Sequence, residues 1–198
     1  MAGFEGLAAT GRTLERVLNA AFVEQQPIPG QRTRAVLART ADFDASVVAA
    51  NIGAPALSIL VYRVDFNKTM RAAWSAVASE DGLSRLALDL HVLLTPWADN
   101  ADFELRILGR TMQALETTPI FSGPLLDPLT AWAPNESVQL VLEDISTEAV
   151  MRTFDSLPTD YRLSVPYIAR IVRLDGRVPR GDSFVSTLVT GLTAEARP

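Results

Sequence analysis

The chain has 198 residues, of which 48% are apolar and 21% charged, and its formal net charge is −5 at pH 7. This composition is typical of one globular domain and excludes an intrinsically disordered chain. The acidic balance and the scattered placement of the arginines argue against nucleic-acid binding, and the absence of Cys excludes disulfides, thiol catalysis and thiolate metal sites.

The first third of the chain predicts one helix and two strands. Apolar or small residues recur at a helical period over residues 4–25, and two prolines then end this helix. Such an amphipathic helix either packs on its own sheet or docks a partner. Residues 33–39 predict a short strand, residues 42–55 a loop, and residues 57–66 a strand that is apolar on both faces. A strand of that kind suits the centre of a sheet covered on two sides.

The middle of the chain predicts two more strands and the most clearly marked helix. Residues 70–77 predict a partner strand, and residues 83–94 alternate more regularly. The helix that follows begins after Asp99 or Asn100, either of which can cap it. It has two apolar faces, one with Leu105, Leu108, Met112 and Leu115 and the other with Phe103, Ile107 and Ala114. The second face needs a cover, which is either a long loop or another subunit.

The last third of the chain begins with a long apolar loop. Residues 118–134 combine prolines with large apolar side chains, and such a loop either wraps its own domain or contacts a partner. Residues 138–143 predict a strand, residues 147–156 a short helix, and residues 163–174 a strand. Pro166 must lie at an edge, a bulge or the start of its strand, because proline cannot donate a hydrogen bond to the ladder.

These elements predict an α/β (α+β) fold with a central mixed β-sheet flanked by helices. We expect one domain over residues 1–176 and a C-terminal tail over residues 177–198, in which residues 184–192 predict one more strand. The N-terminus shows no signal-peptide pattern, and the longest uncharged stretch, residues 45–62, is broken by Asn, Gly and Pro. We therefore expect a cytoplasmic chain that does not enter a membrane.

No catalytic constellation is visible in the sequence. His91 is the single histidine, and because no serine elbow or second histidine accompanies it, we interpret it as structural. Asp99, Asp102 and Glu104 resemble a cation site but lead directly into a helix, where capping and dipole effects account for them. Glycine-rich phosphate loops are absent. The sequence thus predicts no enzyme, no cofactor and no metal, and a hydrolase with a metal held by Asp and Glu is the alternative.

Two stretches, taken together, resemble a known family. Residues 88–99 read LDLHVLLTPWAD and residues 103–115 read FELRILGRTMQAL. After a Leu-Pro pair, residues 161–173 read YRLSVPYIARIVR. The order and spacing of these stretches resemble the cap, or tail-terminator, proteins of phage-tail-like contractile injection systems such as the antifeeding prophage. The resemblance implies a fold related to phage tail terminators.

The resemblance also implies a structural role. Such a cap forms a ring of six copies on the last layer of the inner tube and contractile sheath, ends polymerisation and stabilises the particle. The implied partners are further copies of the chain, the inner-tube protein and the sheath protein, with no nucleic acid and no membrane. The alternative within the same kind of particle is a baseplate or neck adaptor.

A closed ring requires two different contact surfaces on each subunit. The helix face at Phe103 and the apolar loop are the candidates for these surfaces. The predicted interface residues are Phe103, Ile107, Phe121, Leu125, Leu126 and Trp132. Residues 165–172 or the tail could also add an edge strand to the sheet of a neighbour.

Overall fold

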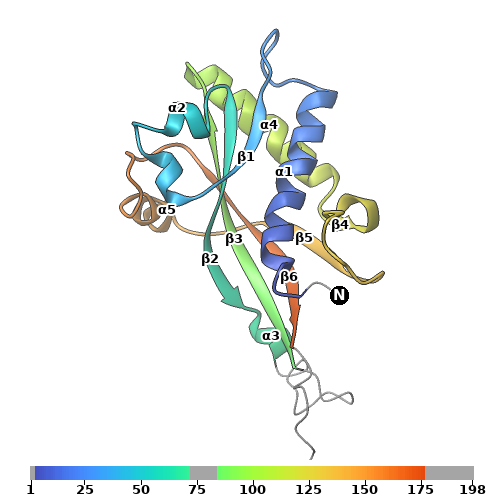
Figure 1. Ribbon diagram of the computed structural model, residues 1–198. Helices are drawn as coiled ribbons and strands as arrows, with labels where there is room; N and C mark the ends of the chain where they lie inside the picture. Colours follow the sequence, from blue (N-terminus) through green and yellow to red (C-terminus); the bar gives the residue numbers. More distant parts are fainter. Residues whose placement is uncertain (1–2, 72–83, 177–198) are drawn as a thin grey trace, which may run out of the picture.

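Six strands form one mixed sheet in the structure, a computed structural model that describes residues 3–71 and 84–176 (Figure 1). In the order in which they lie in the sheet, the strands are β1 (Arg34–Ala38), β2 (Ala56–Phe66), β3 (Arg85–Trp97), β6 (Val165–Asp175), β5 (Ser137–Leu142) and β4 (Ile120–Ser122). The β1–β2 pair is parallel and every other pair is antiparallel. The predicted mixed sheet is thereby confirmed.

Helices cover the two faces of one half of this sheet, with α1 on the right of Figure 1 and α2 and α5 on the left. The helices are α1 (Gly6–Glu24), α2 (Val48–Asn51), α3 (Lys68–Arg71), α4 (Ala101–Thr117) and α5 (Thr147–Phe154), together with the 3-10 turns η1 (Thr40–Phe43) and η2 (Gly123–Leu125). Of the two alternatives for the first helix, packing on its own sheet is the observed one.

The larger core lies between the sheet and the helices α1 and α4. Leu14, Leu18 and Phe22 of α1 are at most 2% exposed, as their helical spacing requires. Gly11 allows this approach, because a Cβ at that position would lie 3.0 Å from the Leu37 side chain of β1. The N-terminal helix and β1 are therefore held together by shape as well as by apolar burial.

A smaller core covers the opposite face of the same half. It consists of side chains from β2, β3, η1 and α5, with Phe43 packed edge-on against Trp97 at a ring-centroid distance of 5.6 Å. The indole Nε1 of Trp97 donates to Ser58 Oγ at 2.9 Å, which satisfies the buried polar groups of both residues. The first half of β2 is thus covered on both faces, as its apolar pattern predicted.

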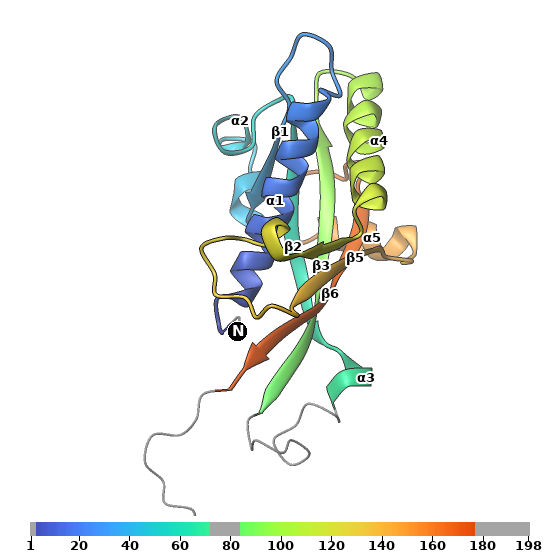
Figure 2. The same cartoon turned by 90° about the vertical axis from the view of Figure 1, so that its right-hand side faces the viewer.

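The other half of the sheet extends beyond α1, α2, α4 and α5 as a strand arm, with only the short helix α3 beside its end (Figures 1 and 2). We define the strand arm as residues 62–66 of β2, 85–89 of β3 and 172–175 of β6. β1 pairs only with Ala56–Leu60 of β2, and β5 pairs only with Tyr167–Arg170 of β6. Within the described residues the strands β2 and β6 therefore each have a strand neighbour on one side only in the arm. Val64 and Leu86 are 45% and 44% exposed there.

The helix α4 differs from its prediction, because it buries one face and not two. The buried residues are Ile107, Leu108, Thr111, Ala114 and Leu115. Leu105 and Met112, assigned to an apolar stripe, are 58% and 37% exposed. Thr111 can lie in the core because its hydroxyl donates to the Ile107 carbonyl oxygen at 2.8 Å.

Two strand predictions also need correction. Met70 belongs to α3, so no strand begins there, and the rest of residues 70–77 lies outside the described residues apart from Arg71, which is also helical. The predicted edge at residues 165–172 is not free over Tyr167–Arg170, since β6 lies between β3 and β5 there. From Val172 onward β6 has β3 as its only strand neighbour within the described residues. Pro166 is the second residue of β6, which agrees with its predicted place at the strand's start. The predicted tail and its strand at residues 184–192 lie outside the described residues.

Candidate assembly surface

Three of the predicted interface residues lie in the subunit's own core. Ile107, Phe121 and Leu126 are 0%, 1% and 3% exposed. A side chain without solvent exposure cannot contact a partner while the subunit keeps this fold, so the interface assignment is not kept for these three. Phe103 and Trp132 are partly buried against the same core, and Leu125 is 39% exposed. These last three remain predicted interface residues.

The long apolar loop is fastened to α1, which decides between its two predicted roles in favour of wrapping the domain. Arg12 Nη2 lies 2.7 Å from Asp127 Oδ2, and the Asp127 backbone N–H donates to Thr13 Oγ1 at 2.8 Å. Trp132 Nε1 donates to the Asp127 carbonyl oxygen at 3.0 Å. Arg16 donates to three consecutive loop carbonyls that end at Leu126. Phe121 and Leu126 of the loop thus belong to the core, whereas Leu125 and Leu129 are 39% and 82% exposed.

Asp127 is the centre of this attachment, and its ionisation reflects that position. Its side chain is 7% exposed. Burial by itself raises the pKa of Asp127, but the hydrogen bonds from Arg12 and Thr130 outweigh burial and hold that pKa below its usual value. The loop is therefore held by a carboxylate that stays charged at neutral pH.

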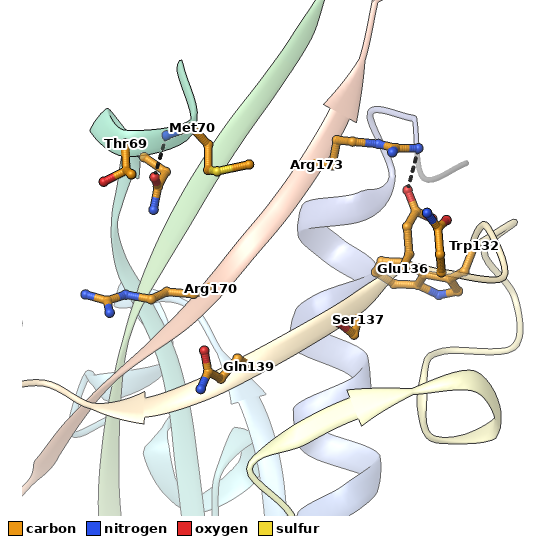
Figure 3. Close-up of a pocket in the computed structure, with 10 residues that line it drawn as sticks. Thr69, Met70, Trp132, Glu136, Ser137, Gln139, Arg170 and Arg173 are labelled. Atoms are coloured by element: carbon orange, nitrogen blue, oxygen red, sulfur yellow. Dashed lines mark hydrogen bonds and ion pairs between the residues drawn. The ribbon is translucent and has the colours of Figure 1, made fainter. Parts of the chain in front are cut away.

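A groove of about 540 Å³ opens on the sheet face that α1 does not cover (Figure 3). Gln139 and Arg170 lie opposite each other on β5 and β6, and their chain neighbours Leu140 and Ala169 face the larger core. Because side chains alternate along a strand, Gln139 and Arg170 point to the opposite face. Figure 3 shows both side chains in front of the strands, with α1 passing behind. Trp132 lies at one end of the groove.

The lining of the groove is rich in polar groups without a partner. Arg170 lines the groove, and Lys68 lies beside it, between the lining residues Asn67 and Thr69 in the chain. Neither forms an ion pair or a hydrogen bond, and among the Lys and Arg side chains that the structure describes only Arg32 shares this property. Arg173 differs, since it pairs with Glu136 at 3.1 Å and with Asp175 at 3.0 Å. The groove therefore presents the unpaired cation Arg170, with Lys68 close by, beside a neutralised ion-pair network.

A second hollow of about 520 Å³ shares Arg170 with the groove and reaches His91. His91 Nδ1 lies 2.7 Å from Glu143 Oε1, and its Nε2 lies 3.3 Å from Asp65 Oδ2. Tyr62 Oη donates to Glu143 Oε2 at 2.8 Å, and Arg63 pairs with both carboxylates at 3.0 and 3.3 Å. Burial, followed by the bond to Glu143, raises the pKa of Tyr62.

This cluster joins β2, β3 and the end of β5, and every polar side chain in it is already engaged by another. A general base needs a nucleophile or a substrate proton within reach, and the Tyr62 hydroxyl is committed to Glu143. The His91 side chain is 5% exposed. Its structural interpretation is kept, with Glu143 as the partner that sequence reasoning missed because 52 positions separate the two residues.

Side chains of α1 cover the outer edge of the sheet at β1. The Asn19 side chain of α1 donates to the Ala35 carbonyl oxygen at 2.9 Å and accepts from the Ala35 N–H at 3.0 Å. Glu15 Oε1 accepts from the Leu37 N–H at 3.1 Å. These side chains occupy the edge of β1 that a further strand would use. The hydrogen bonds of Asn19 and Glu15 all lie on β1, so neither side chain covers an edge of the strand arm.

Within residues 3–71 and 84–176 no group of three or more His, Asp or Glu side chains is placed to hold a metal ion. In the same residues no helix has the length and apolar character needed to cross a bilayer. The features that stand out on the described surface are therefore the groove, the strand arm and scattered exposed apolar side chains.

Comparison with known proteins agrees with the fold. A family model described as the Pvc16 N-terminal domain matches residues 9–187. Among solved structures, the tube-terminating cap of the anti-feeding prophage superposes with a TM-score of 0.50 at 17% identity, over 96% of this chain and 60% of that chain. The PVC sheath/tube terminator in its extended state, from an extracellular contractile injection system, gives 0.49 at 16% identity, over 94% and 64%. This chain thus spans less than two thirds of either structure. No curated protein matches it.

Proposed function

This chain belongs to the Pvc16 N-terminal domain family, and from that membership we propose that it is a structural terminator, or cap, subunit of a contractile injection system. In this role the subunit sits on the distal end of the inner tube and sheath, ends their polymerisation and stabilises the particle. The family match over residues 9–187 is the observation that carries the proposal.

The fold supports the proposal in a second way. The sheet and its helices superpose on the tube-terminating cap of the anti-feeding prophage, with nearly the whole chain covered. Proteins that share a fold can have different functions. The similarity in fold therefore adds to the family match and does not replace it. The resemblance noted in residues 88–115 and 161–173 falls within the matched range.

We further propose that the subunit is non-enzymatic and works as a homohexameric ring, with the tube and sheath proteins as its partners. The bonds of Tyr62 and His91 to Glu143, which leave both side chains engaged within the subunit, fit this role. A ring also needs two unlike contact surfaces on each subunit, and the groove and the α5 side of the molecule are unlike in charge. Assembly in the cytoplasm follows if tube and sheath polymerise there.

The direct test is co-expression of the chain with the tube and sheath proteins of a contractile injection system, followed by electron microscopy of the particles. We expect added density at the end distal to the baseplate, and longer or irregular tubes when the chain is omitted. Density at the baseplate end would instead identify a baseplate adaptor. Tubes of unchanged length, with no added density at either end, would contradict the proposal.

A further inference from the structure

We propose that the groove of one subunit binds the acidic corner of a second copy of this chain, where the acidic corner consists of Met151, Asp155, Asp160 and Tyr161. In this contact Arg170 of the groove and Lys68 of the adjoining hollow face the carboxylates of Asp155 and Asp160. The contact is heterologous, because it joins two different surfaces of the subunit. The inference does not depend on the proposed function.

The groove contributes positive charge that the subunit itself leaves unpaired. Arg170 is exposed and lies opposite Gln139 on β5, which also makes no side-chain hydrogen bond within the described residues. Lys68 lies next to Asn67 and Thr69, which line the wall of the same groove. An arginine on a flat strand face can bind a carboxylate with two parallel hydrogen bonds. The ligand chemistry that fits is thus a surface with carboxylates.

The acidic corner supplies carboxylates of the required kind. Asp155 and Asp160 are exposed and form neither an ion pair nor a side-chain hydrogen bond within the described residues. Beside them Met151 and Tyr161 are 49% and 47% exposed, and Tyr161 packs edge-on against Phe154 at 5.4 Å. Exposed aromatic and methionine side chains next to unpaired charge are typical of protein interfaces. The apolar side chains Met70 and Trp132 in the groove provide the matching apolar contact.

The second copy is the occupant that the charges favour, because one chain carries both complementary surfaces. The corner lies at the end of α5 and the groove lies over β5, β6 and α3, so they occupy different parts of the molecule (Figures 1 and 3). When one surface of a subunit binds a different surface of the next copy, repetition of this contact forms a ring or a filament. Screening by salt weakens such a contact, since both partners are solvent-exposed.

The test uses two charge-reversed variants of the full chain in sedimentation velocity, without tube or sheath. Lys68→Glu/Arg170→Glu reverses the groove, and Asp155→Arg/Asp160→Arg reverses the corner. We expect the wild-type chain to self-associate, and each variant to associate more weakly by about tenfold or more. In an equimolar mixture, the intact corner of the groove variant meets the intact groove of the corner variant, and the two reversed surfaces are also opposite in charge. We therefore expect the mixture to regain association.

The matched controls are Arg32→Glu and Asp99→Arg, which reverse exposed unpaired charges away from both surfaces and leave association unchanged. Circular dichroism checks that every variant is folded. A strictly monomeric wild-type chain would overturn the proposal, as would variants that associate like wild type or a mixture that stays monomeric. The assay contains no tube, so a negative result would overturn this proposal without testing the terminator role. The tube-end experiment described above tests that role.

Discussion

At the scale of single residues, Asp127 shows how one carboxylate holds a long loop. It accepts from Arg12 and Thr130, and its backbone is bound to Thr13 and Trp132. The pKa of Asp127 is lowered in the folded chain. A carboxyl group with a lowered folded pKa stabilises the fold above its unfolded pKa of about 3.9, and that stabilisation is lost as the pH falls through the folded pKa.

Asp127→Asn therefore gives a pH-dependent prediction. At pH 7 we expect the free energy of unfolding to fall by about 1–3 kcal/mol, because Arg12 loses a charged acceptor at a buried position. The difference from wild type should shrink as the pH falls below about 4, because the unfolded chain then binds a proton that the folded chain, with its lowered pKa, does not yet bind. Urea denaturation of both proteins between pH 7 and pH 3 measures the loss of unfolding free energy at neutral pH and its decrease at low pH. Glu24→Gln, which alters an exposed pair with Arg110, serves as the control. A difference that stays constant with pH would contradict the assignment.

Glu143 is the second residue with a large predicted effect. Its side chain is 5% exposed and accepts from Tyr62, Arg63 and His91. Glu143→Ala leaves these donors without their acceptor, and we expect a loss of about 3 kcal/mol in the free energy of unfolding. Asp65→Ala removes the half-exposed carboxylate of the same cluster and should cost less than about 1 kcal/mol. Equal losses for the two variants, measured by urea denaturation, would argue against a buried role for Glu143.

At the scale of elements, the start of α4 shows which of two predicted caps is used. Asn100 Oδ1 accepts from the Phe103 backbone N–H at 3.0 Å, and Asp99 makes no such bond. We expect Asn100→Ala to lower the free energy of unfolding by about 1 kcal/mol and Asp99→Ala to lower it by no more than a few tenths. Thermal or urea denaturation of the two variants provides the comparison, and a larger effect at Asp99 would reverse the assignment.

The outer edge of β1 is protected by two side chains of α1, which mutation can remove. Glu15→Ala/Asn19→Ala frees the backbone groups of Ala35 and Leu37 that these side chains now occupy. An uncovered edge strand promotes pairing with another chain. We expect the double variant to form larger species in light scattering at concentrations where wild type does not. Gln113→Ala/Glu116→Ala, on the exposed side of α4, is the matched control, and equal scattering of all three proteins would contradict the proposed protection.

At the scale of the whole molecule, the sheet is divided into a half that stabilises and a half that is open to partners. The larger core covers one face along all six strands, and the smaller core covers the opposite face of the half that contains β1. The other half presents the groove and the strand arm, with free cations and exposed apolar side chains. A subunit that must meet both its own copies and a tube end needs open surface of this kind. The division thus suits an assembly role better than a closed enzyme pocket.

The sequence by itself determined the helices α1, α4 and α5, the strands β1, β2, β3, β5 and β6, the cap at Asn100 as one of two options, and the family resemblance. These features depend on local periodicity and local capping, which a single stretch of chain records. Only the tertiary structure decided that Ile107 is buried and Leu105 exposed, since helix rotation depends on what the sheet offers. It also brought together Gln139 with Arg170 and His91 with Glu143, pairs that are distant along the chain and whose contact is set by strand order and packing.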